Sequence, residues 1–160
     1  MQEGEFYAKA KEYFESESFP LPKSVFREFY SQLIKLSGFG LGGIFVLSGK
    51  KAGSKAAIYL KSLLGESLTN EDIKACITAA LQSYNQKVVE FNLEPDFVLI
   101  KIDNSIFAEG ITSKKPVCLP LGGSLAGMME TFTNAHWEPK EIECKACGGA
   151  YCVFELKRKD

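Results

Sequence analysis

Histidine is nearly absent from this 160-residue sequence, and neither sign of charge is in excess. His136 is the only histidine, and no catalytic triad, carboxylate dyad or separate acid–base cluster is evident, so the sequence does not predict an enzyme. Nineteen basic residues against 20 acidic ones give a net charge of −1. No overall field therefore draws the protein to nucleic acid or to an anionic membrane.

Long apolar runs are also missing. No segment reaches the roughly 18 apolar residues that a membrane-spanning helix needs. The first residues, MQEGEFYAKAKEYF, are charged and lack the apolar run of a signal peptide. We therefore expect a cytoplasmic protein with no membrane partner, in which thiols stay reduced. The five cysteines are an odd number, which also disfavours a disulfide framework.

Two glycine-rich segments resemble phosphate-binding motifs only superficially. Residues 38–43 (GFGLGG) match GxGxxG, but a predicted helix precedes them where the dinucleotide fingerprint needs a strand. Residues 49–55 do not have the spacing of a P-loop. These glycines are more typical of turns or of tight packing.

Apolar residues at helical spacing predict helices over residues 5–16, 23–36, 49–64 and 123–133, with one more beginning at Thr69. The last of these has a capping-box pattern, and Cys76 lies within its apolar stripe, which is typical of a core thiol. Residues 41–48 are apolar and fit either a strand or a buried helix. The first 37 residues are rich in aromatic side chains and read as a helical arm that either covers the domain or pairs with another copy.

The apolar period then changes from helical spacing to two. Val89, Phe91 and Leu93 alternate, and a second alternating run follows a turn at Pro95, which predicts a β-hairpin. Residues 141–145 and 151–157 predict a second hairpin. We therefore expect an α+β fold, with a four-stranded antiparallel sheet of two hairpins, helices packed on it, an N-terminal arm at residues 1–37 and a domain at residues 38–160.

The segment ECKACGGAYC, residues 143–152, holds three of the five cysteines. Ile142 and Cys144 are expected on one face of the hairpin, and symmetric closure of its loop places Cys144 opposite Cys152, close enough for one metal ion. Cys118, which precedes a predicted helix, is a third candidate ligand. On spacing alone a zinc site and free structural thiols remain equally open. The CxxC at residues 144–147 leads into a glycine turn, which does not favour a redox motif.

The stretch from Pro116 to Glu155, PVCLPLGGSLAGMMETF…EIECKACGGAYCVFE, resembles the 4-vinyl reductase domain. This is the small-molecule-binding module of archaeal hydrocarbon-binding proteins, of phenol-sensing transcription activators and of a bacteriochlorophyll-synthesis accessory protein. It is distantly similar to subunits of the TRAPP vesicle-tethering complex. The features that carry the resemblance are a cysteine before GxxxG, then ExxC, a glycine turn and CxF.

The resemblance implies a structural zinc bound by Cys118, Glu141, Cys144 and Cys152. On a regular strand, however, Glu141 and Cys144 point to opposite faces. A bulge or the length of the glutamate side chain must bring the carboxylate round; otherwise Glu143 or His136 takes its place. Cys147 matches no ligand position of the family.

The resemblance further implies a cytoplasmic binding module for a small hydrophobic or aromatic molecule. The alternatives are a TRAPP-like interaction scaffold and an accessory factor in tetrapyrrole vinyl reduction. Six residues are candidates for the wall of a ligand pocket between sheet and helices: Phe97, Phe107, Met128, Met129, Phe132 and Trp137. We also expect a homodimer, formed through the aromatic surface of the N-terminal arm.

Overall fold

The computed structural model of the chain describes residues 3–159. Over this range the helices are α1 (Glu3–Ser16), α2 (Lys23–Leu33), α3 (Gly42–Leu64), α4 (Asn70–Ser83) and α5 (Leu119–Thr133), with short 3₁₀ segments η1 (Ile34–Phe39) and η2 (Lys145–Cys147). The strands are β1 (Lys87–Leu93), β2 (Phe97–Asp103), β3 (His136–Glu143) and β4 (Cys152–Lys159).

All four strands belong to one antiparallel sheet with the order β1-β2-β4-β3. The two hairpins, β1–β2 and β3–β4, are joined where β2 pairs with β4. The expected α+β class and the sheet of two hairpins are thus confirmed.

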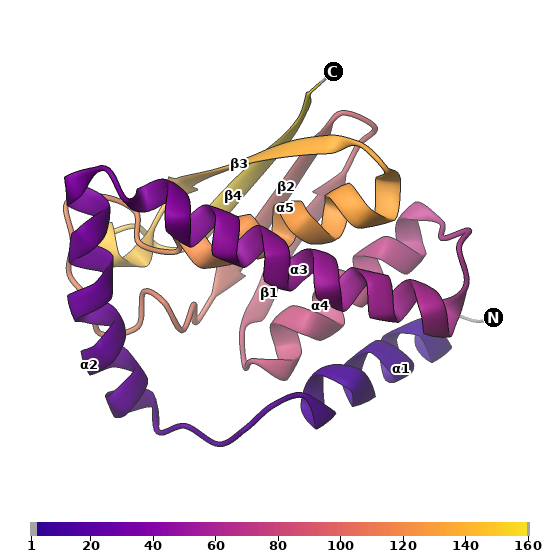
Figure 1. Ribbon diagram of the computed structural model, residues 1–160, viewed down its shortest axis with the longest axis horizontal. Helices are drawn as coiled ribbons and strands as arrows, with labels where there is room; N and C mark the ends of the chain where they lie inside the picture. Colours follow the sequence, from indigo (N-terminus) through magenta and orange to yellow (C-terminus); the bar gives the residue numbers. More distant parts are fainter. Residues whose placement is uncertain (1–2, 160) are drawn as a thin grey trace.

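The helices build layers on one side of the sheet, as Figure 1 shows. Helix α5 lies next to the sheet and contacts β3, while α3 runs along α5 in front of it. Helix α1 packs on α4, and α4 contacts β1. Because α5 is enclosed between α3 and the sheet, most of its side chains are buried. Among the described residues, no helix is both long and apolar enough to span a bilayer.

Helices α3 and α5 touch through their backbones. Each carries two glycines four residues apart, at Gly49 and Gly53 and at Gly123 and Gly127. A Cβ added at Gly53 would lie 2.0 Å from the carbonyl oxygen of Ser124, and one at Gly123 would lie 2.1 Å from that of Val46. Only glycine fits such an approach. Gly49 and Gly53 therefore serve tight packing, and residues 42–48 are helix rather than strand.

The N-terminal arm is largely covered by its own chain. Phe6 and Phe14 of α1 are buried, and so is Tyr30 of α2, whose hydroxyl donates to the carbonyl of Val117. Phe29 stays exposed. The predicted boundary between residues 37 and 38 falls inside η1. Much of the aromatic surface on which we based the dimer prediction is thus already packed within one molecule.

Two bulges correct the predicted alternation of side chains. The register of β1 with β2 shifts between Val88 and Glu90, so Val88 packs on the core and Val89 is 43% exposed. The register of β3 with β4 shifts between Glu141 and Glu143, and Ile142 is 46% exposed. The predictions that Val89 faces inward with Phe91 and that Ile142 shares a face with Cys144 were therefore wrong, because each bulge reverses the parity of the residues beyond it.

Candidate metal centre and cavities

Four side chains from three parts of the fold converge at one end of the sheet. Cys118 precedes the first residue of α5, Glu141 lies in β3, Cys144 follows β3 and Cys152 begins β4. One ligand atom from each can be chosen so that all four lie within 4.8 Å of one another. The three sulfurs are buried and the carboxylate is partly buried. The residues implied by the family resemblance are thus together in space and can hold a metal ion.

The bulge at Ile142 is what turns Glu141 toward the cysteines. Glu141 pairs with Phe154, whereas Glu143 pairs with Val153, so one extra residue stands between them on β3. Without this residue Glu141 and Cys144 would face opposite sides of the sheet. With it, both lie on the buried face.

Neighbouring polar groups orient the four donors. The backbone N–H of Cys118 donates to Glu141 Oε2 at 2.9 Å, and that of Lys145 donates to Cys152 Sγ at 3.5 Å. The buried Ser105 Oγ lies 3.1 Å from Cys118 Sγ. Contacts of this kind fix the direction of metal ligands. Sequence reasoning missed Ser105, because no motif marks a serine in the loop after β2.

The electrostatics of the cluster favour a cation. Burial, and then the neighbouring Cys144, raise the pKa of Glu141 to about 8. Hydrogen bonds to Cys144 and Cys152, together with burial, raise the pKa of Cys118, whereas hydrogen bonds from Cys118 and Cys152 lower the pKa of Cys144. Negative charges this close repel one another, so few of the four groups ionise unless a positive charge lies between them.

One oxygen of the cluster has no partner. Glu141 Oε1 is buried and makes no hydrogen bond, a condition that destabilises a folded protein. A divalent cation at the centre of the cluster would supply the missing partner. Three cysteine sulfurs and one carboxylate oxygen form a donor set that suits tetrahedral zinc. The residues present therefore fit the metal that the resemblance implies.

The competing ligand candidates are engaged elsewhere. The carboxylate of Glu143 accepts a hydrogen bond from the N–H of Tyr151 at 2.9 Å. His136 Nδ1 lies 2.8 Å from the carboxylate of Glu130. Cys147 is exposed and is not one of the four clustered donors, while Cys76 is buried in the core of α4.

Three hollows of the surface have contrasting linings. The inner cavity, of about 260 Å³, lies among α1, α3, α4 and α5. It is lined by Tyr13, Phe14, Glu17, Ala52, Ala56, Ala80, Leu81, Tyr84, Gln86, Leu121, Ser124, Leu125 and Met128. An outer groove of about 400 Å³ lies beside the segment between α1 and α2, where Phe19 and Leu21 line it. Tyr84 lines both, so the outer groove adjoins the inner cavity.

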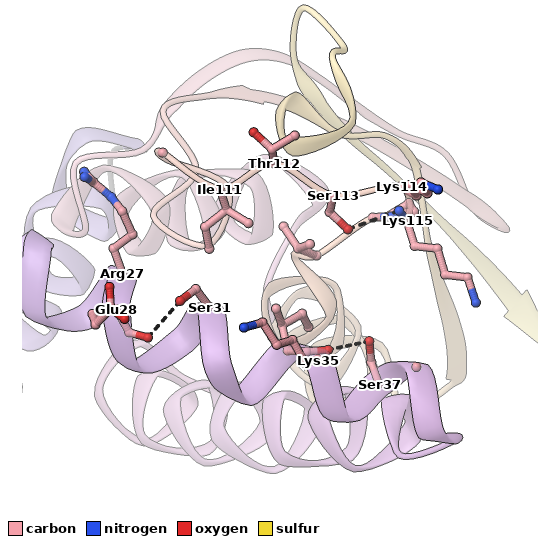
Figure 2. A pocket seen from close by; sticks show the side chains of 15 residues that line it. Arg27, Glu28, Ser31, Lys35, Ser37, Ile111, Thr112, Ser113, Lys114 and Lys115 are labelled. Carbon is pink, nitrogen blue, oxygen red and sulfur yellow. Dashed lines mark hydrogen bonds between the residues drawn. The ribbon is translucent and has the colours of Figure 1, made fainter.

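The third hollow, of about 470 Å³, lies between α2–η1 and residues 110–117. Figure 2 shows its polar rim, with the side chains of Arg27, Lys35, Lys114 and Lys115 around it. These cationic groups make it a poor site for an uncharged apolar molecule.

Of the six predicted pocket residues, Met128 lines the inner cavity. Met129 and Trp137 are fully buried, and the ring of Phe107 packs edge-on against Tyr30. Phe132 packs against the core, and Phe97 is half-buried at the start of β2. These five line none of the three hollows.

Comparisons with known proteins agree with this geometry. A model of the 4-vinyl reductase domain family matches residues 98–158. No curated protein sequence matches the chain significantly. Solved structures show the fold. One is the phenol-responsive sensory domain of the transcription activator PoxR with phenol, which has a TM-score of 0.65 at 15% identity and is covered over 76% of its length by 88% of this chain.

Two further structures share the fold. A vinyl-4-reductase family protein from Methanocaldococcus jannaschii has a TM-score of 0.56 at 18% identity, with 91% of this chain and 87% of that chain covered. A trafficking protein particle complex subunit 3 from Naegleria fowleri, covalently bound to palmitic acid, has a TM-score of 0.64 at 13% identity, with 86% and 95% covered. The predicted family resemblance is confirmed: the chain carries a 4-vinyl reductase domain, which begins within β2 and includes all four candidate metal ligands.

Proposed function

We propose that the protein is a cytoplasmic binding module for a small hydrophobic or aromatic molecule, with a structural zinc. The observation that carries this proposal is the inner cavity. Its wall consists mainly of aromatic rings, alanines and the side chains of Leu121, Leu125 and Met128. A volume of about 260 Å³ lies just below the usual range of ligand pockets and suits a molecule of a few carbon atoms or one ring.

The 4-vinyl reductase domain and two structures of the same fold support this proposal. One is described with phenol and the other with covalently bound palmitic acid, so related scaffolds hold apolar guests of quite different length. Met128 adds adaptability to the wall, because an unbranched thioether adjusts to the shape of a guest.

The zinc would be held by Cys118, Glu141, Cys144 and Cys152. Its role would be structural, because the protein supplies all four ligands and leaves no open position for a substrate. Through Cys118 the ion would tie the start of α5 to the β3–β4 hairpin. Leu121, Leu125 and Met128 on α5 line the inner cavity, so the metal would also hold the cavity wall in place.

A thermal-shift screen of small apolar and aromatic compounds tests the ligand, and native mass spectrometry of protein purified without chelator tests the metal. We expect some compounds to raise the melting temperature through preferential binding to the folded state, and about one zinc per chain. Failure of every compound to shift the melting temperature would overturn the ligand-binding proposal. Metal content far below one per chain would overturn the zinc site.

The second candidate function is a TRAPP-like interaction scaffold. An exposed apolar row favours it: Phe39 on η1, Leu41, and Ile44 and Leu47 on α3. A homodimer that covers this row is the form we propose, since two-fold dimers are the commonest soluble oligomers. Light scattering at micromolar concentration should give twice the chain mass of 17.7 kDa, and Leu47→Asp should lower it. A mass of one chain would contradict the dimer.

A further inference from the structure

Gln86 stands at the turn that ends α4, where the backbone holds it firmly. Asn85 adopts a left-handed conformation with φ of 57°, and its N–H donates to the carbonyl of Gln82. The N–H of Gln86 donates to the carbonyl of Leu81. These two bonds form a Schellman motif, so backbone geometry sets where the Gln86 side chain begins.

The side chain at this position of a Schellman motif is frequently apolar and packs against the preceding helix. Here it is an amide that is only 2% exposed, and its Oε1 has no hydrogen-bond partner. A buried amide oxygen without a partner destabilises the folded state. An apolar residue would avoid this loss, so the fold alone does not account for glutamine.

Within residues 3–159, the other buried side-chain oxygen that lacks a partner is Glu141 Oε1, at the candidate metal centre. There the missing partner is a metal ion. Gln86 lines the inner cavity, where Leu121, Leu125 and Met128 are among its neighbours in the wall and offer no hydrogen bond. The partner of Gln86 is therefore to be sought in a molecule that occupies the cavity.

We infer that the ligand of the inner cavity is a small apolar or aromatic molecule with a hydroxyl group, which donates a hydrogen bond to Gln86 Oε1. This inference rests on the proposed ligand-binding function and adds the residue that selects the ligand. A hydroxyl both donates and accepts, so it also suits the amide turned by 180°, with Nε2 toward the ligand. The apolar wall supplies most of the affinity, and Gln86 discriminates between the hydroxyl compound and its ether.

Isothermal titration calorimetry with two matched probes tests this selection. The probes are 4-ethylphenol and 4-ethylanisole, which share the ring and the ethyl group but differ in the hydrogen-bond donor. We expect the wild type to bind 4-ethylphenol at least about fivefold more tightly, because the ether leaves the buried amide oxygen unpaired. In Gln86→Leu the preference should fall to within about twofold. The melting temperature of the free variant should not fall, because the unpaired amide is gone.

The two levels of the proposal fail in different ways. If neither probe binds, and the wider apolar screen is also negative, the ligand-binding function itself is overturned. If the wild type binds both probes equally, or Gln86→Leu keeps the preference, only the role of Gln86 is overturned. Ala56→Phe, which fills the inner cavity, should abolish binding of both probes; unchanged binding would place the ligand elsewhere. Gln86→Met serves as the second variant should the leucine variant fail to fold.

Discussion

Adding a single methyl group at Gly53 should push helices α3 and α5 apart. In Gly53→Ala the new Cβ would lie 2.0 Å from the carbonyl oxygen of Ser124, whereas real Cβ contacts essentially never fall below 3.0 Å. The difference, 3.0 − 2.0, means that one helix must move by at least about 1 Å. The atom in the way belongs to the backbone of α5, so no side-chain rotation can relieve the contact.

Two opposing effects set the expected change in the free energy of unfolding. Overpacking of this kind costs about 3 kcal/mol at the upper end of its usual range. Replacing a helical glycine by alanine returns about 1 kcal/mol of helix propensity. The net loss is therefore about 2 kcal/mol, which lowers the melting temperature by about 4–8 °C in a domain of this size.

Gly43→Ala provides the matched control in the same helix. A Cβ at Gly43 meets nothing within 4 Å, so only the propensity gain remains and this variant should be up to about 1 kcal/mol more stable than the wild type. Urea unfolding of the three proteins, with equal m-values as the check on a shared unfolded state, measures both changes. If Gly53→Ala stabilised the protein as Gly43→Ala does, the two helices would not be in backbone contact.

Three other substitutions probe the metal centre, an ion pair and a helix cap. Cys144→Ser should lose most of the bound zinc and unfold at lower temperature, whereas Cys76→Ala should keep its metal content; retention of a full zinc in Cys144→Ser would contradict the ligand set. Burial opposes ionisation of Glu130, but hydrogen bonds from Lys50 and from the N–H of Trp137 outweigh it and lower the pKa of the carboxyl. Because the folded pKa is the lower one, Glu130→Gln should be about 1–3 kcal/mol less stable than the wild type at pH 7, and the difference should shrink as the pH falls below about 4. An unfolding free energy that does not depend on this substitution at pH 7 would refute the role of the ion pair. Thr69→Ala should cost about 1 kcal/mol in urea unfolding, because the capping box between Thr69 and Asp72 begins α4, and no measurable loss would mean that the cap is not formed in solution.

Local patterns determined most of the secondary structure of this chain. The helical spacing in residues 70–83, the capping box at Thr69 and the period of two in β2 depend on neighbours within a few residues, so the sequence alone reveals them. The cysteine spacing of the last hairpin also held, because hairpin pairing relates residues by their distance from the turn. The family motif added Cys118 and Glu141, which local pairing does not connect.

Contacts between distant segments decided the rest. The bulge at Ile142 arises from the pairing of β3 with β4, and residues 42–48 are helix because α5 packs against α3, so neither has a clear local signal. The burial of Phe6 and Phe14 depends on α4. Periodicity identifies which side chains point inward, but a cavity forms where facing surfaces fail to fill the space between them. That failure depends on the volumes of side chains from four helices together, and for this reason only the tertiary structure brought Gln86 to the edge of an apolar cavity without a partner.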